Sequence, residues 1–155
     1  MRKKFNDKDY QWGLDGERFV YCWLSKLGYK VEANKNKYGA DLFLHAPKLG
    51  RIPIEVERRK PSNWPTKAFP WDDYNLPERR YAKSLKSLLI VLAADMSRAL
   101  LVYPSSLFDA LQFNKFCVED NVYVKCEKVL RIPVDLCRDV CTNTRGLKIG
   151  RNEEF

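Results

Sequence analysis

The chain has 155 residues, which suits one domain and is long enough to bury a hydrophobic core. Hydrophobic residues make up 45% of it, which excludes wholesale disorder. Lys and Arg number 28 against 20 Asp and Glu, and this net charge of +8 favours polyanionic partners, nucleic acid first. No apolar run approaches the roughly 20 residues of a membrane span, and none follows the basic start as in a secretory signal. We therefore expect a cytoplasmic protein without a membrane partner or a small-molecule cofactor.

The five cysteines do not indicate a disulfide framework, because their number is odd and no pair has CxxC spacing. Cys137 and Cys141 are four residues apart and, with Cys126 and the single histidine, His45, would supply four zinc ligands. The alternative is a set of buried free thiols in a reducing cytosol, and we favour it.

Apolar residues recur at helical spacing over residues 16–27 and predict a helix, with Asp15 as its N-cap and Gly28 as its left-handed stop. A strand is expected to begin near Tyr29. A second strand is expected at 41–45, followed by a hairpin turn at 47–50.

Residues 51–58 predict a third strand, because apolar residues occupy every second position. Glu55 and Glu57 lie on the face opposite these apolar residues. Residues 59–75 contain three prolines and predict an irregular loop. A loop of this length is uncommon in a compact domain and is often functional.

A helix is expected over 76–87, with Pro77 in its first turn. The unbroken apolar run at 88–94 is typical of a strand covered on both faces. The elements expected after it are a strand at 99–103, a helix at 107–111, a turn at 119–121, strands at 122–126 and 128–133, a helix at 134–140 and a flexible tail at 142–155. This order predicts a single α/β domain with a mixed central sheet flanked by helices, comprising a core at about 15–103 and a C-terminal extension at 104–141.

Three carboxylates stand out by their positions, because Asp41 opens the second strand while Glu55 and Glu57 share one face of the third. Consecutive strands usually pair, so the hairpin is expected to bring Asp41 near the two glutamates. Crowded acids repel one another unless a cation lies among them, and oxygen ligands suit Mg²⁺. Such a metal activates water and neutralises charge on a phosphodiester. The alternative is a solvated strand face with no ligand.

Two segments resemble the core motif of the PD-(D/E)xK nucleases, namely residues 39–43 (GADLF) and 52–59 (IPIEVERR). That superfamily includes restriction endonucleases, Holliday-junction resolvases and phage recombination exonucleases. The resemblance covers about residues 15–103. It implies a restriction-endonuclease-like α-β-β-β-α-β core with Mg²⁺, or Mn²⁺ in its place, at the motif acids. By this resemblance Asp41 is the first metal ligand and Glu55 the second.

Glu57 departs from the family pattern, because it stands where the family usually has lysine. The resemblance implies either that Glu57 is a third ligand or general base, or that the chain has lost activity and only binds. By the same resemblance Glu17 is a fourth ligand; the alternative is an acid favoured by the start of a helix. The missing cation is expected from Lys83 or Lys60.

Cations and aromatic residues follow the motif strand in a mixture that suits nucleic-acid contact. We predict such contacts for Arg58, Arg59, Lys60, Trp64, Lys67, Arg79, Arg80 and Lys83. The alternative is that the loop aromatics cover a sheet edge or make a dimer contact.

The sequence therefore predicts a Mg²⁺-dependent deoxyribonuclease, with DNA a better expectation than RNA. The residues predicted to take part in catalysis are Asp41, Glu55, Glu57, Lys83 and Lys60. The small size favours structure-directed or nonspecific endonuclease cutting, junction-resolvase-like activity included, and a homodimer if both strands are cut. One alternative is an inactive nuclease fold that serves in nucleic-acid binding or assembly. Another is an α/β interaction protein whose acids are surface residues.

Overall fold

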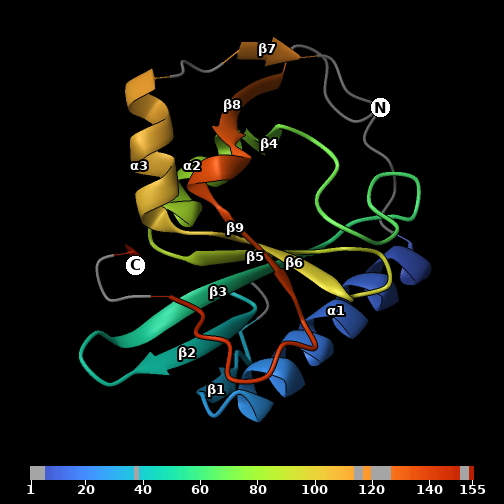
Figure 1. The fold of residues 1–155 in the computed structure, drawn as a ribbon, viewed down its shortest axis with the longest axis vertical. Coiled ribbons are helices and arrows are strands. Elements are labelled where there is room, and N and C mark those ends of the chain that lie inside the picture. Colours follow the sequence, from blue (N-terminus) through green and yellow to red (C-terminus); the bar gives the residue numbers. More distant parts are fainter. Residues whose placement is uncertain (1–5, 37–38, 114–116, 120–126, 151–153) are drawn as a thin grey trace.

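The computed structural model describes residues 6–36, 39–113, 117–119, 127–150 and 154–155, and these form a mixed α/β structure (Figure 1). The helices are α1 (Asp7–Lys26), α2 (Glu78–Ser84), α3 (Pro104–Phe113) and the short 3-10 helix η1 (Val134–Leu136). The strands are β1 (Lys30–Ala33), β2 (Leu42–Ala46), β3 (Gly50–Arg58), β4 (Asp73–Pro77), β5 (Leu88–Leu92), β6 (Arg98–Val102), β7 (Cys117–Glu119), β8 (Glu127–Pro133) and β9 (Arg138–Cys141).

Six strands form the central sheet, in the order β1-β2-β3-β5-β6-β9. The pair β3–β5 is parallel and the other pairs are antiparallel. A parallel pair needs a crossover connection, and α2 lies within it, between β3 and β5. The small sheet consists of the antiparallel strands β4, β8 and β7, in that order. The predicted mixed central sheet flanked by helices is thus confirmed.

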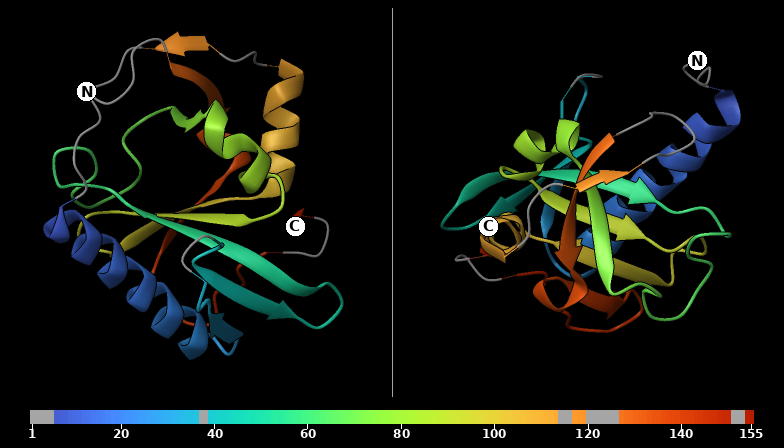
Figure 2. Two further views of the ribbon diagram at one scale, coloured as in Figure 1. Left: turned by 180° about the vertical axis from the view of Figure 1, so that it is seen from behind. Right: turned by 90° about the horizontal axis from the view of Figure 1, so that it is seen from above.

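Strand β5 separates two hydrophobic cores and is buried along its whole length. Leu88, Ile90 and Leu92 pack into the core beneath α1, whereas Leu89 and Val91 pack into the core beneath the small sheet. Figure 2 shows α1 on one face of the central sheet and the small sheet with α2 on the other. The predicted strand covered on both faces is confirmed.

Strand β3 shows the predicted alternation, with Ile52 and Ile54 buried on the α1 side. Glu55 and Glu57 are paired in register with Leu89 and Val91, so their side chains face the small sheet. The predicted turn at 47–50 joins β2 to β3. Gly28 ends α1 with φ +95°, the left-handed conformation expected of it.

Helix α1 is longer than predicted, because it begins at Asp7 rather than at 16. Asn6 is its N-cap, and the Asn6 side chain accepts a hydrogen bond from the Asp9 backbone N–H at 2.8 Å. The expectation of Asp15 as the cap was therefore wrong. The polar first turns lack an apolar stripe, which is why periodicity alone missed them.

Strand β4 lies where the sequence predicted the end of a loop and the start of a helix, so α2 begins only at Glu78. Residues 134–140 form η1 and the edge strand β9 instead of the predicted helix. Strand β7 ends at Glu119, and the rest of the predicted turn at 119–121 and the strand at 122–126 lie outside the described residues.

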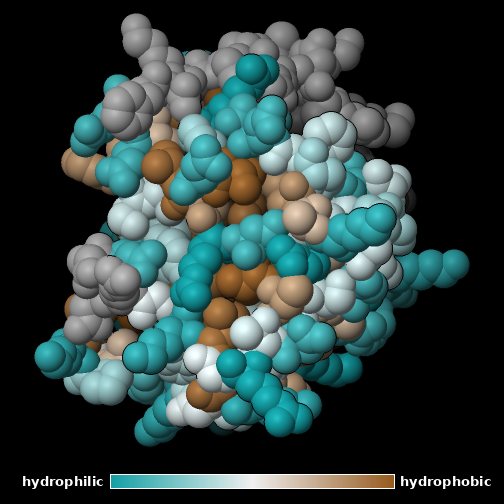
Figure 3. Space-filling view, viewed as in Figure 1, coloured by the Kyte–Doolittle hydropathy of each residue, from teal (hydrophilic) through white to brown (hydrophobic). Residues whose placement is uncertain are grey.

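The C-terminal stretch is not a free tail over its described part, because Ile149 is fully buried in the core beneath α1. Phe155 packs edge-on against Tyr103, with ring centroids 5.8 Å apart. On the face seen in Figure 3, two clusters of apolar side chains are separated by a hydrophilic band. In the part of the chain that the structure describes, no helix is long and apolar enough to cross a membrane.

Candidate active site

Asp41 is held at the start of β2 by the neighbouring strand. The β2–β3 register ends with Leu42 paired to Ile54, and Asp41 directly precedes Leu42. The Asp41 backbone N–H donates to the Ile54 carbonyl at 3.0 Å, and Asp41 Oδ2 accepts from the Val56 N–H at 2.8 Å. Backbone contacts with β3 therefore fix the Asp41 carboxylate at the point where the pairing of β2 with β3 ends.

Glu17 reaches the same place from α1. Its carboxyl is hydrogen bonded to that of Asp41. Burial, then the charge of Asp41 and this hydrogen bond, raise the pKa of Glu17 to about 7, and the charge of Glu55 adds to the effect. Near neutral pH, Glu17 therefore holds a proton that an isolated glutamate would have lost.

Glu55 completes a group of three carboxyls that we call the acid cluster, formed by Glu17, Asp41 and Glu55. Burial and then the charge of Asp41 raise the pKa of Glu55, while Lys83 and Arg80 act in the opposite direction. Lys83 Nζ on α2 lies 3.4 Å from Glu55 Oε1. Four separate segments of the chain thus meet here: α1, the start of β2, β3 and α2.

A close approach between α1 and β3 helps to bring Glu17 into this position. A Cβ at Gly16 would lie 3.3 Å from Arg58 Cβ and 3.5 Å from Leu92 Cδ1, so a larger residue would push the helix away. Because Glu17 directly follows Gly16, the missing side chain lets the helix bring its carboxylate near the strands.

The segment before Asp41 is organised by Asn34. Asn34 Nδ2 donates to the Ala40 carbonyl at 2.7 Å, and Asn34 Oδ1 accepts from the Asn36 N–H at 2.9 Å. A Cβ at Gly39 would lie 2.5 Å from Asn34 Nδ2, too close for any side chain. Asn34 was not among the predicted site residues. An Asn a few residues ahead of a Gly-Ala-Asp turn is the sequence signal that could have indicated it.

Two hollows, of about 650 and 350 Å³, adjoin the acid cluster, and both are lined by Glu17, Asp41 and Asn34. The larger one also contacts Tyr10 and Lys35. The paired carboxyls are therefore reachable by a ligand.

Glu57 is engaged elsewhere, although it shares a strand face with Glu55. Its Oε2 accepts hydrogen bonds from the Tyr74 hydroxyl at 2.5 Å and from Arg80 at 2.9 Å. Arg59 Nε lies 3.0 Å from Glu57 Oε1, close enough for an ion pair but without hydrogen-bond geometry. Burial raises the pKa of Glu57, but the two arginines and the hydrogen bonds outweigh it and hold that pKa below its usual value. Glu57 thus behaves as a partly buried anchor for cations.

Lys60 and Arg58 contact α1 instead of the acid cluster. Lys60 Nζ lies 2.9 Å from Asp9 Oδ1, and the Arg58 guanidinium lies 3.5 Å from the centre of the Trp12 ring. Arg58 also donates to the Ala94 carbonyl at 2.7 and 3.0 Å. Of the two lysines predicted as the catalytic cation, Lys83 is the one that the structure brings to the acid cluster.

The other residues predicted to contact nucleic acid divide by exposure. Trp64 is fully buried and donates from Nε1 to the Lys67 carbonyl, so its side chain does not reach the surface where the predicted nucleic-acid contact would form. Lys67 is exposed, and Arg79, 61% exposed, pairs with Glu127 at 3.1 Å. Arg80 binds Glu57, as described above.

The zinc alternative is not supported by the described residues. His45 on β2 contacts Glu32 at 3.0 Å, whereas Cys141 on β9 lies four strand positions away, roughly 19 Å across the sheet. Arg98 donates to the sulfur of Cys141, and Cys126 lies outside the described residues. Cys22 is exposed, so the expectation of a buried thiol was wrong for that residue.

The acid cluster offers only carboxylate oxygens, the donors that Mg²⁺ and Mn²⁺ prefer. Over residues 6–36, 39–113 and the other described ranges, no three His, Cys, Asp or Glu side chains already form a metal-binding group, so a cation would have to draw the three carboxyls together. No model of a known protein family matches this chain, and no curated protein matches it significantly.

Proposed function

We propose that this chain is a metal-dependent nuclease of the PD-(D/E)xK type that hydrolyses phosphodiester bonds in DNA. The observation that carries the proposal is the meeting of the acid cluster with Lys83. The order of elements also supports it, because α1-β1-β2-β3-α2-β5, with β3 parallel to β5, matches the α-β-β-β-α-β order that the sequence resemblance implies once β4 of the small sheet, between β3 and α2, is set aside.

The acid cluster would hold Mg²⁺, or Mn²⁺ in its place. When bound, such an ion acts as a Lewis acid on a phosphate and lowers the pKa of water. The chemistry of the donors fits, because burial and then the charge of Asp41 raise the pKa of Glu17 to about 7. A cation would offset both the burial of these carboxyls and their mutual repulsion. Cation binding would therefore release the proton that Glu17 holds near neutral pH.

Lys83 takes the role of the lysine that the motif strand lacks. Its ammonium group lies beside Glu55, where it would stabilise negative charge on a phosphate held at the acid cluster. Asp41 is fixed by the Val56 N–H and needs little reorganisation to act. In this proposal Glu57 is not a metal ligand; it holds Arg59 and Arg80.

The net charge of +8 supports a polyanionic substrate, and we propose DNA rather than RNA. We propose structure-directed or nonspecific endonuclease cutting, with a homodimer where both strands are cut. A location inside the cell would suit that substrate.

A second candidate is a nuclease fold that binds nucleic acid without turnover. The specific observation in its favour is Glu57 at the usual lysine position, with both carboxylate oxygens occupied by cations and a tyrosine.

Cleavage assays separate the two candidates. Branched, duplex and single-stranded DNA would be incubated with the chain and Mn²⁺, beside Asp41→Asn, Glu55→Gln and the control Glu32→Gln, an exposed acid on β1. We expect cleavage by the wild type and the control, and none by the two variants of the acid cluster. Failure of the wild type on every substrate would leave the binding candidate.

A further inference from the structure

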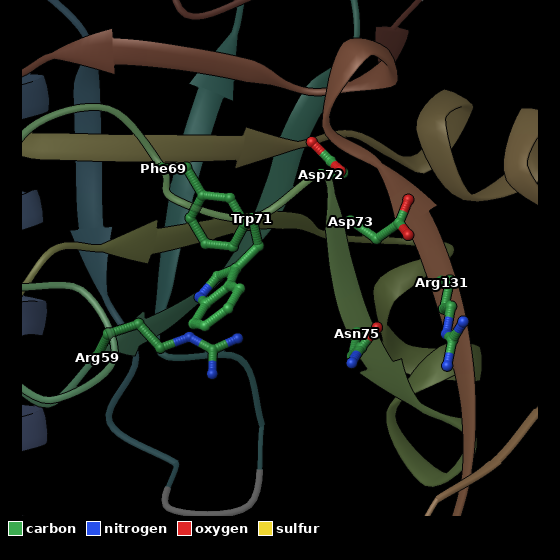
Figure 4. Close-up of a pocket in the computed structure, with 7 residues that line it drawn as sticks. All are labelled: Arg59, Phe69, Trp71, Asp72, Asp73, Asn75 and Arg131. Carbon is green, nitrogen blue, oxygen red and sulfur yellow. The ribbon is translucent and has the colours of Figure 1, made fainter.

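A third hollow, of about 480 Å³, lies at the far end of β3 (Figure 4). Its lining includes Arg59, Phe69, Trp71, Asp73, Asn75 and Arg131. Arg59 follows Glu55 by four residues, and its N–H donates to the Leu92 carbonyl at 2.9 Å, so the chain continues β3 in extended form. The hollow therefore begins roughly 13 Å from Glu55 along the strand, a span of a few nucleotides.

Trp71 is the exposed member of an otherwise buried aromatic group. Its side chain is 59% exposed, whereas Trp64, Phe69 and Tyr74 are between 0 and 9% exposed. Trp64 and Phe69 pack edge to face, with centroids 5.0 Å apart. The loop thus uses three aromatic rings to cover the small-sheet core and leaves one indole in water beside cations, where it is open to a flat partner.

Two of the polar side chains that line the hollow come from the paired strands β4 and β8. Asn75 and Arg131 are paired in register, so they share the face of the small sheet opposite the buried Tyr74 and Leu76. Figure 4 shows the guanidinium of Arg59 and the indole of Trp71 pointing into the space that faces Asn75 and Arg131.

Two arginines and two aspartates, Asp72 and Asp73, line this space together, so their formal charges cancel. A row of phosphates would meet the aspartates and be repelled. A base suits the hollow better, because its ring can stack on the indole while carboxylate and amide groups bind its edge.

We propose that this hollow binds one unpaired base of the DNA strand held at the acid cluster, with a preference for bases that carry an exocyclic amino group. Trp71 stacks on the base, Asp73 accepts from the amino group, and Arg59 contacts the adjoining phosphate. The proposal rests on the proposed nuclease function and adds a substrate class to it: DNA with a single-stranded segment beside the cut.

Binding of labelled oligo-dC and oligo-dT to the full chain, followed by fluorescence anisotropy in EDTA, tests this site without cleavage. Trp71→Ala should weaken the binding of both oligonucleotides roughly tenfold, while Trp71→Phe should retain most of the affinity. Phe108→Ala on α3 is the matched control, since Phe108 is 62% exposed, and it should change nothing. Asp73→Asn should reduce the preference for oligo-dC over oligo-dT.

Unchanged oligonucleotide binding by Trp71→Ala overturns the proposal, as does an equal loss in Phe108→Ala. A change in oligomeric state of Trp71→Ala with unchanged DNA binding also overturns it and assigns the indole to a dimer contact. These failures differ from failure of the nuclease function. A chain that cleaves duplex DNA through Asp41 but binds oligonucleotides independently of Trp71 retains the nuclease and loses only the base site.

Discussion

Lys83 Nζ lies 3.4 Å from Glu55 Oε1, so α2, the helix that follows β3 and β4, places a cation beside the acid cluster. Lys83→Met should lower the single-turnover rate of DNA cleavage about a hundredfold, since it removes charge stabilisation at the phosphate. The thermal midpoint should barely move, because the lysine side chain is 57% exposed. Lys86→Met, an exposed lysine just after α2, is the control. Equal rates for the two variants would remove Lys83 from the site.

Glu57 stabilises the fold through its cations. Glu57→Ala leaves Arg59 and Arg80 without their carboxylate, and we expect a loss of about 2–4 kcal/mol in the free energy of unfolding. Urea denaturation measures it, with the exposed acid variant Glu32→Gln as reference. A loss no larger than that of the reference would show that the ion pairs contribute nothing.

Glu57 also makes the free energy of unfolding depend on pH, in a direction that its pKa shift predicts. The pKa of Glu57 is lowered in the folded chain, so its stabilisation is present above the ordinary glutamate pKa of 4.5 and is lost as the pH falls below it. The stability difference between the wild type and Glu57→Gln should therefore shrink on acidification through that range. Denaturation at several pH values tests this, and a difference that stays constant would contradict it.

The pKa shift of Glu17 predicts the opposite dependence of stability on pH. Its pKa is raised from 4.5 to about 7, so the folded chain binds an extra proton between these values, and stability without metal should fall as the pH rises across them. Glu17→Gln should flatten this decline. Mg²⁺ should raise the thermal midpoint of the wild type more at pH 8 than at pH 6, because the ion competes with the proton. A metal effect independent of pH would separate Glu17 from the metal.

Two glycines provide a matched test of the segment that precedes Asp41. Gly39→Ala should weaken metal binding and lower stability, because its Cβ would displace the Asn34 amide from the Ala40 carbonyl. Gly13→Ala within α1 meets nothing within 4 Å and should stabilise the chain by about 0.5–1 kcal/mol. Calorimetry and metal titration of both variants test this, and a neutral Gly39→Ala would mean that the segment adjusts freely.

The sequence alone predicted those elements whose pattern is local. The apolar run of β5 and the alternation of β3 were sufficient to predict these two strands, because each pattern indicates which faces of the strand are buried. Strand β4 was missed because prolines surround it and its pairing partner, β8, lies more than fifty residues away along the chain. The predicted helix at 134–140 is wrong at β9, because the pairing with β6, which the local sequence does not indicate, makes Arg138–Cys141 extended.

The candidate site likewise has one part that the local sequence predicts and another that depends on tertiary packing. The proximity of Asp41 to Glu55 follows from the β2–β3 hairpin, whose turn the sequence predicts. The partners of Glu57 do not, because Tyr74 and Arg80 come from β4 and α2 and reach it only through tertiary packing. Glu57, two residues along β3 from Glu55, thus has a different set of direct partners, although Arg80 acts on both.

The central claim is that the acid cluster binds one cation through all three carboxyls. Calorimetric titration with Mn²⁺ at pH 8 tests it on the wild type, on Glu17→Gln, Asp41→Asn and Glu55→Gln, and on the control Glu32→Gln. We predict a single Mn²⁺ site in the wild type and the control, weakened at least tenfold in each of the three variants. Binding that survives in all three, or is lost equally in the control, would contradict the claim.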